Sequence, residues 1–311
     1  MGSSTRIEFA DVTINPWHGC TKKSAGCANC YAERWDRRGL HGDPTWGLTV
    51  PRRIRVGRAV EELNAASRRA ARRGPLRVFL GSMCDVFEDR ADLVEPRLHL
   101  WRCLQQLLPD EQGPLSVMVL TKRPEIMLRW AQDHGWPPGL WAGVSIENQA
   151  TADERVELLT ALDQPVVRWV SAGPLLGPVD LSRWLNRLDW VVASGESGRR
   201  ARPCLTAWMR HLRDQAAAAG VPFFYKQPGA WREATRDERG IHGKKLAIHF
   251  AFDGRRLKMT ERFDPVVGDR VMVQRTKAEA KDRTLDGQAH LAFPNLPPQT
   301  EPGRTADDVA H

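Results

Sequence analysis

Along the chain, short apolar runs alternate with longer stretches in which apolar residues recur every three or four positions. The short runs predict seven strands, at 12–15, 77–82, 117–121, 140–145, 167–171, 190–194 and 222–226. The longer stretches predict five helices, at 59–73, 92–108, 125–134, 150–162 and 207–219. This alternation is typical of βαβ units in a parallel sheet. We therefore expect an α/β fold and favour a partial TIM-type βα barrel, although an open doubly wound sheet gives the same local pattern.

The pattern changes beyond residue 230. A chain of 311 residues fits one α/β barrel of roughly 250 residues with an appendage, and we assign 1–230 to the barrel. Short β-like runs around an Asp253-Gly254 turn predict a small C-terminal α+β appendage over 231–293. From 294 to 311, proline, threonine and acidic residues replace apolar ones, which predicts a disordered tail.

Polar or small residues follow nearly every predicted strand. Such clusters stand at 82–85, 121–123, 145–148, 171–173, 194–198 and 226–227. Parallel strands present their carboxyl ends on one face, so we expect these clusters to surround a single mouth where ligands bind. The alternative interpretation is that these residues only begin loops.

Composition and charge narrow the class of protein. The chain has no apolar run near the roughly 20 residues of a membrane helix and no apolar signal segment, so we expect a cytoplasmic protein without a membrane partner. A formal net charge of +8 favours polyanionic partners such as nucleic acid. Arg68, Arg69, Arg72 and Arg73 form the densest basic cluster. We favour a solvated outer helix face for them and keep a phosphate-binding patch as the alternative.

Three cysteines, Cys20, Cys27 and Cys30, follow the first predicted strand and therefore lie at the predicted mouth. Thiols this close in sequence suit zinc, iron–sulfur or disulfide chemistry, and a cytoplasmic setting disfavours a disulfide. Structural zinc takes four ligands, whereas three thiolates on a [4Fe–4S] cluster leave one iron open. We predict a [4Fe–4S] site at these three residues. Zinc is the alternative, with a fourth ligand from His18, His41 or Cys84.

Several motifs extend a resemblance over most of the chain. They are NPWHGC at 15–20, GSMCDVF at 81–87, LTKRP at 120–124, GVSIENQ at 143–149, PLLGP at 174–178 and GESG at 195–198. In this order they resemble a three-cysteine family of phages and bacteria, known as a radical-SAM-like domain of unknown function. That family lies beside the spore photoproduct lyase-like radical S-adenosylmethionine (SAM) enzymes.

The resemblance implies a reaction. An open iron chelates the amino and carboxylate groups of S-adenosylmethionine, and one electron from the reduced cluster cleaves the sulfonium to give a 5′-deoxyadenosyl radical. A reductant such as flavodoxin or ferredoxin supplies the electron. The protein then positions a substrate and excludes water.

The resemblance also implies roles for the strand ends. Candidates for binding S-adenosylmethionine are Ser82, Asp85, Ser145, Glu147, Asn148 and Ser171. Within this set, Ser82 and Asp85 are assigned to the methionine amino group, and Glu147 and Asn148 to the ribose. The catalytic candidates are Lys122, Lys226 and Glu196, with the lysines offering positive charge to a carboxylate or phosphate. The alternative is that these charged groups only neutralise one another at the mouth.

One spacing and three positions depart from the family's pattern. Six residues separate Cys20 from Cys27, where radical SAM enzymes usually have three, and Asn29 stands where an aromatic residue commonly precedes the third cysteine. Gly173 replaces an expected Glu, and Ser194 an expected glycine.

Two classes of function are consistent with the sequence. The first is a radical SAM enzyme that modifies or repairs a nucleic acid base or nucleotide. The second is a zinc-stabilised, nucleic-acid-associated binding protein without catalysis. Radical SAM chemistry on a small metabolite or peptide is a variant of the first.

Overall fold

The computed structural model describes residues 5, 7–39, 42–110, 113–163, 165–198, 200–233, 247–250, 270–274 and 283–294. Its main feature is a seven-stranded parallel sheet in the order β1-β4-β5-β6-β7-β8-β9. The strands are β1 (Val12–Ile14), β4 (Leu76–Leu80), β5 (Leu115–Thr121), β6 (Leu140–Ile146), β7 (Arg168–Ala172), β8 (Trp190–Ser194) and β9 (Phe223–Gln227). All seven predicted strands are confirmed.

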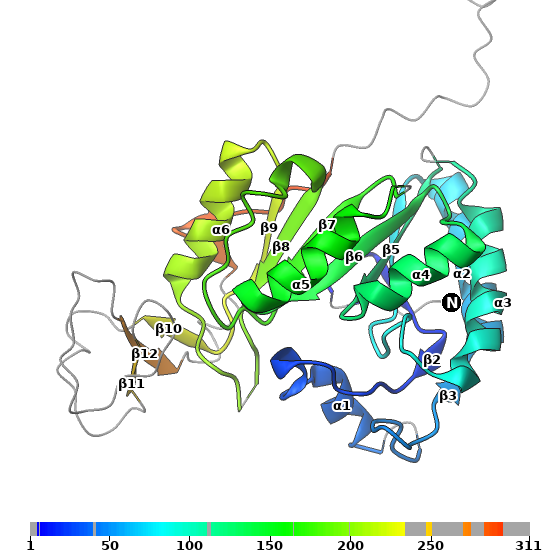
Figure 1. Ribbon diagram of the computed structural model, residues 1–311, viewed down its shortest axis with the longest axis horizontal. Helices are drawn as coiled ribbons and strands as arrows, with labels where there is room; N and C mark the ends of the chain where they lie inside the picture. Colours follow the sequence, from blue (N-terminus) through cyan, green and yellow to red (C-terminus); the bar gives the residue numbers. More distant parts are fainter. Residues whose placement is uncertain are drawn as a thin grey trace, which may run out of the picture.

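The sheet curls into a half-barrel with helices around it (Figure 1). The helices are α2 (Val56–Arg73), α3 (Val94–Leu107), α4 (Pro124–His134), α5 (Gln149–Thr160) and α6 (Thr206–Ala218), which confirms the five predicted helices. The strand order follows the chain without a reversal, whereas a doubly wound sheet reverses at a switch point. Among the described strands, β1 and β9 form the two edges, so the partial barrel is confirmed over the open doubly wound sheet.

Alternation of side chains along the strands explains the interior of the half-barrel. One set of side chains packs under the helices, and the other points inward and forms an aromatic floor. The floor consists of Phe9, Phe79, Trp141, Trp169, Trp190 and Phe224. The ring of Phe9, from the N-terminal segment, lies 5.5 Å from that of Phe79 and 5.7 Å from that of Trp169. A Cβ on Gly143 would lie 2.3 Å from the Trp169 ring, so the ring needs a glycine there.

The segment between β1 and α2 carries the cysteines and crosses the carboxyl ends of the strands (Figure 1). It contains β2 (Trp17–His18), which pairs antiparallel with β3 (Arg53–Ile54), the 3₁₀ turn η1 (Ala25–Cys27) and α1 (Tyr31–Asp36). None of these four elements was predicted from the sequence.

β10 (Trp231–Glu233), β12 (Arg270–Gln274) and β11 (Ala247–Phe250) form a small antiparallel sheet of their own. A two-stranded sheet, β13 (Thr284–Leu285) with β14 (Gln288–Ala289), follows. The predicted turn at 253–254 and the tail after 294 lie outside the described residues. No helix in the described ranges combines the length and the apolar character needed to cross a membrane.

Candidate metal centre at the mouth of the half-barrel

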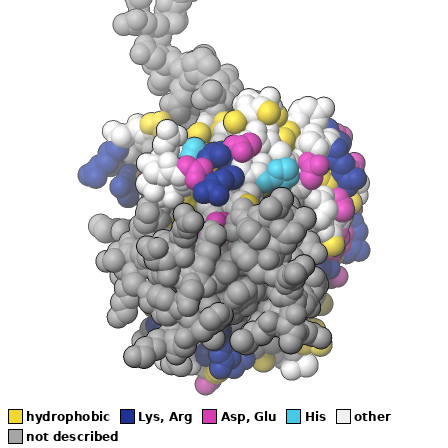
Figure 2. Space-filling view, turned by 90° about the vertical axis from the view of Figure 1, so that its left-hand side faces the viewer, with side chains coloured by type: hydrophobic (Ala, Val, Ile, Leu, Met, Phe, Trp, Pro, Cys, Tyr) yellow, Lys and Arg dark blue, Asp and Glu magenta, His cyan; other side chains and the backbone are white. Residues whose placement is uncertain are grey.

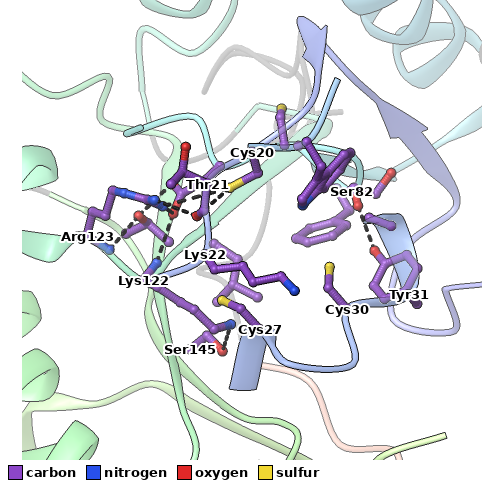
Figure 3. A pocket seen from close by; sticks show the side chains of 18 residues that line it. Cys20, Thr21, Lys22, Cys27, Cys30, Tyr31, Ser82, Lys122, Arg123 and Ser145 are labelled. Atoms are coloured by element: carbon purple, nitrogen blue, oxygen red, sulfur yellow. Dashed lines mark hydrogen bonds and ion pairs between the residues drawn. The ribbon is translucent and has the colours of Figure 1, made fainter. Parts of the chain in front are cut away.

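The three predicted cysteines line one cavity of about 140 Å³. Cys20, Cys27 and Cys30 are all free thiols, and Figure 3 shows them around the cavity with the Lys22 side chain among them. A fourth free thiol, Cys84, lines the same cavity. The structure therefore brings the sequence-predicted metal ligands together at the predicted mouth.

Backbone contacts with the end of β4 position the first cysteine. Gly19 donates its N–H to the carbonyl of Met83 at 3.1 Å and forms a parallel bridge with Cys84. Its φ of +112° suits glycine, and a Cβ there would lie 2.2 Å from the Thr45 carbonyl oxygen. Substitution of Gly19 would thus push Cys20 out of place.

Asp85 and Arg123 form a buried ion pair beneath this cysteine. Arg123 Nη1 lies 2.9 Å from Asp85 Oδ2 and 3.9 Å from Cys20 Sγ, and its Nη2 donates to the Thr21 carbonyl at 2.8 Å. Thr121 Oγ1 donates to Asp85 Oδ1 at 2.7 Å. Both oxygens of Asp85, a predicted cofactor-binding residue, are thus engaged in positioning Arg123 beside the thiol.

Glu147 attaches the cysteine loop to the end of β6. Its Oε1 accepts a hydrogen bond from Ser24 Oγ at 2.8 Å, and its Oε2 lies 3.3 Å from Arg155 Nη1. The side chains of Glu147 and Arg155 are 0% and 1% exposed. Lys122 Nζ lies 3.7 Å away, and a Cβ on Gly26 would lie 2.3 Å from Glu147 Oε1. This carboxylate is packed directly against the loop.

Glu196, at the end of β8, holds the same loop from the other side. Its Oε2 accepts hydrogen bonds from Asn29 Nδ2 at 3.0 Å and from Arg202 Nε at 2.9 Å. Arg202 also donates to the Ala25 carbonyl at 2.9 Å. Glu147 and Glu196, which we name the loop clamps, therefore fix the loop between Cys20 and Cys30 to two strands of the sheet.

The Glu196 clamp should depend on pH. Although burial alone would raise the pKa of Glu196, hydrogen bonds from Arg202 and Asn29 outweigh it and lower this pKa. A carboxyl with a lower pKa in the folded chain stabilises the fold above its unfolded pKa, near 4.3, and this stability is lost as pH falls through the folded pKa. We expect Glu196→Gln to lower the melting temperature of the metal-free protein at neutral pH. The difference from wild type should shrink below about pH 4.

Thermal melts of both proteins between about pH 7 and pH 3 measure this effect. A difference that stays constant over the whole range would mean that the carboxylate charge contributes nothing to the clamp.

A second cavity, of about 190 Å³, continues inside the half-barrel. It shares Cys30, Tyr31, Lys122 and Ser145 with the first, and Ser171, Glu196 and Lys226 also line it. Lys122 Nζ donates to Ser145 Oγ at 2.7 Å. Lys226 Nζ lies 5.3 Å above the Phe9 ring, and burial lowers the pKa of this amine. The walls are therefore polar and carry charges of both signs, whereas the floor is aromatic.

Two departures from the family pattern meet in this second cavity. A Cβ on Gly173 would lie 2.4 Å from Ser194 Oγ, so the serine hydroxyl occupies the space that a side chain at 173 needs. The hydroxyl at 194 and a carboxylate side chain at 173 would therefore compete for the same space.

The other predicted residues have separate places. Ser82 lines the first cavity, and Asn15 Nδ2 donates to its hydroxyl at 3.1 Å. Asn148 caps α5 by accepting a hydrogen bond from the Thr151 N–H at 3.1 Å. Cys103 and Cys204 are buried in the hydrophobic core. His18 is buried in β2, and His41 lies outside the described residues.

The three free thiols are soft donors of the kind that zinc and iron–sulfur clusters both use. Within the part of the chain that the structure describes, no three His, Cys, Asp or Glu side chains are arranged to hold one metal ion. Zinc needs its thiolates about 2.3 Å from one centre, whereas each thiolate of an iron–sulfur cluster binds a different iron. Three thiols around one cavity are consistent with the second arrangement. Burial, with the nearby Asp85 and Glu88 carboxylates, raises the pKa of Cys20 to about 12.

Fold and site together define a half-barrel protein with a thiol-lined cavity at the carboxyl ends of its strands. The chain belongs to the DUF5131 family of proteins of unknown function, whose model matches residues 4–294. No curated protein matches the chain.

Among solved structures, the chain is similar to spore photoproduct lyase. A double mutant with bound AdoMet and dinucleoside spore photoproduct gives a TM-score of 0.47 at 11% identity, over 90% of this chain and 73% of that one. A complex with dinucleoside spore photoproduct gives 0.45 at 11% identity, over the same shares. This likeness concerns the fold and says nothing of the reaction.

Proposed function

We propose that this protein is a radical SAM enzyme that holds a [4Fe–4S] cluster on Cys20, Cys27 and Cys30. The proposal is carried by the three free thiols of one loop around one cavity, at the mouth of a half-barrel. Bound there, such a cluster supplies the electron that cleaves S-adenosylmethionine to methionine and a 5′-deoxyadenosyl radical, with a flavodoxin or ferredoxin as reductant.

The remaining roles, positioning the cysteine loop and contacting cofactor and substrate, belong to residues of the chain itself. Arg123 places a positive charge 3.9 Å from Cys20 Sγ and so offsets part of the rise in the pKa of this thiol that burial and the nearby carboxylates cause. The buried carboxylates Asp85, Glu147 and Glu196 act as positioning residues, because their oxygens are engaged by protein groups. We assign contact with cofactor and substrate to groups that line the cavities, namely Ser82, Ser145, Ser171, Lys122 and Lys226.

The substrate class follows from the walls and the floor of the inner cavity. Lys122 and Lys226 offer cationic groups suited to a phosphate, and Phe9 and Phe79, the two rings of the aromatic floor that line this cavity, offer apolar faces suited to a base. The floor also excludes water from below, which a reaction with a carbon radical requires. We infer that the substrate is a nucleic acid base or nucleotide.

Formation of 5′-deoxyadenosine tests the proposed reaction. Protein reconstituted and reduced with dithionite without oxygen should convert S-adenosylmethionine to methionine and 5′-deoxyadenosine, slowly without substrate and faster with it. Chromatography of the quenched mixture measures both products, with the Cys30→Ala variant as the control. A protein with a complete, reducible cluster that forms no 5′-deoxyadenosine would exclude the radical reaction. A colourless protein with one zinc would support the binding protein instead.

A further inference from the structure

A wide basic cleft lies outside the cysteine loop and is separate from the two inner cavities. Its volume is about 660 Å³, against the roughly 300–1,000 Å³ of typical ligand sites. Lys22, Arg34, Arg37 and Arg200 line it, with Glu33 as its acidic residue. We name it the α1 cleft, because α1 forms one wall. Its lining carries four positive charges against one negative charge.

Most of this positive charge faces solvent. The Glu33 carboxylate lies 3.1 Å from Lys22 Nζ and 2.7 Å from Arg37 Nη2 and neutralises one charge between them. The side chains of Lys22 and Arg37 remain 50% and 69% exposed, and Arg200 is exposed. Arg34 donates to the Ser197 carbonyl at 3.2 Å, a contact that leaves its charge in place. The cleft therefore keeps a net charge of +3 (four minus one) for an anion.

Two exposed aromatic rings lie on α1 next to the cleft, although neither belongs to its lining. Tyr31 and Trp35 stand one turn apart on α1, and each is 45% exposed, whereas most tryptophans of the described chain are buried. The Arg38 guanidinium lies 5.4 Å above the Trp35 ring. Cationic grooves interleaved with exposed rings bind single-stranded nucleic acid, because phosphates track the cations and bases stack on the rings.

The α1 cleft borders the cysteine site, because the two share lining residues. Asn29 and Cys30 line both the cleft and the inner cavity of about 190 Å³, and Lys22 and Cys30 line both the cleft and the cavity of about 140 Å³. A strand bound along α1 would thus have one nucleotide beside Cys30. This proximity distinguishes the cleft from a basic surface that merely attracts polyanions.

Two other basic surfaces lack these features. Arg68, Arg69, Arg72 and Arg73 line a hollow with Val12 and Leu76, the first residues of β1 and β4, so they lie at the opposite end of the sheet from the mouth. Figure 2 looks onto the side where α6 lies, and its basic and acidic side chains are mixed. Arg210 and Arg213 of α6 both pair with Asp286.

We propose that the α1 cleft binds the phosphates of a single-stranded segment of nucleic acid through Lys22, Arg37 and Arg200, and that Tyr31 and Trp35, on α1 beside the cleft, stack on its bases. This inference rests on the proposed function and names its substrate class as a polymer strand rather than a free nucleotide. It also places the polyanion contact on α1 and not on the α2 arginines.

The experiment compares two double variants with the same change in charge. Arg37→Gln/Arg200→Gln removes two cations from the cleft and leaves Lys22 paired with Glu33, whereas Arg69→Gln/Arg72→Gln removes two from α2. The probe is a fluorescein-labelled oligothymidylate of about 12 nucleotides, within the usual site sizes. Binding is measured by anisotropy from about 50 to 200 mM salt, on protein with its measured iron content.

We expect the cleft variant to bind at least tenfold more weakly at about 100 mM salt. Its salt slope should fall by about 1.4, for two phosphate contacts at about 0.7 each. The α2 variant should stay within about twofold of wild type in affinity and keep its slope. Trp35→Ala should lose about tenfold in affinity with an unchanged slope, because stacking releases no counterions.

Equal losses in the two double variants would overturn the proposal, since net charge alone would then explain binding. Tighter binding of duplex than of the single strand would overturn it as well. The proposed reaction is tested separately. Wild-type protein that binds the strand in the α1 cleft but forms no 5′-deoxyadenosine would support the binding site and contradict the proposed reaction.

Discussion

We expect Cys20→Ala, Cys27→Ala and Cys30→Ala each to lower the bound iron from about four per chain to nearly none. The three thiols line one cavity, and loss of one ligand from a three-thiolate site leaves two irons open rather than one. The brown absorbance of the reconstituted protein should disappear with the iron. Iron analysis and visible spectra after anaerobic reconstitution measure the effect.

Other cysteines of the chain provide the controls. Cys103→Ala and Cys204→Ala should keep their iron, because these thiols are buried in the core away from the mouth. Cys84→Ala is the sharper control, since Cys84 lines the same cavity as the predicted ligands. We expect it to keep its iron. Loss of iron in Cys84→Ala would make this thiol a fourth ligand and close the iron that S-adenosylmethionine needs.

The second large effect should come from Glu147→Ala. The carboxylate is fully buried against Arg155, and removal of one member of a buried ion pair typically costs roughly 3–5 kcal/mol. For a chain of this size, that cost lowers the melting temperature by about 10 °C. The loop should also lose its contact with Ser24, so reconstitution should yield less iron. Thermal melts of metal-free protein and iron analysis measure the two losses.

Glu154→Ala is the matched control, because Glu154 lies 3.9 Å from the same Arg155 but is half-exposed. We expect its stability to stay within about 0.5 kcal/mol of wild type. If Glu147→Ala instead kept its melting temperature and its iron and lost only turnover, the carboxylate would act on cofactor or substrate, as the family resemblance implies.

Much of the fold was predictable because its elements are local in sequence. β4 and β8 are short apolar runs flanked by proline, glycine or aspartate, and α6 has an amphipathic pattern that ends near Gly220. α1 was missed because its six residues are too few for a periodic pattern and two of them, Tyr31 and Trp35, are exposed. β2 and β3 were missed because two-residue strands leave no alternation to detect.

The candidate site was predictable only in part. The three cysteines were found from their spacing, and the structure brings them to one cavity. The partners of the strand-end carboxylates could not be found, because Glu147 and Glu196 meet Ser24 and Asn29 across 123 and 167 positions of sequence. Their position after buried strands indicated a mouth but not which loop would cover it. Arg123 stood beside a predicted residue in the LTKRP motif and could have been identified from it.

The loop clamps have a consequence for the order of assembly. In many small metalloproteins, folding is coupled to metal binding, and the chain folds only when the ion binds. Here Glu147 and Glu196 attach the cysteine loop to the sheet through Ser24, Asn29 and Arg202, with no contribution from a metal. These contacts should help to hold the loop in place before the proposed cluster binds. If the proposed function holds, the amount of active protein in a cell would then depend on the iron available to chains that have already folded.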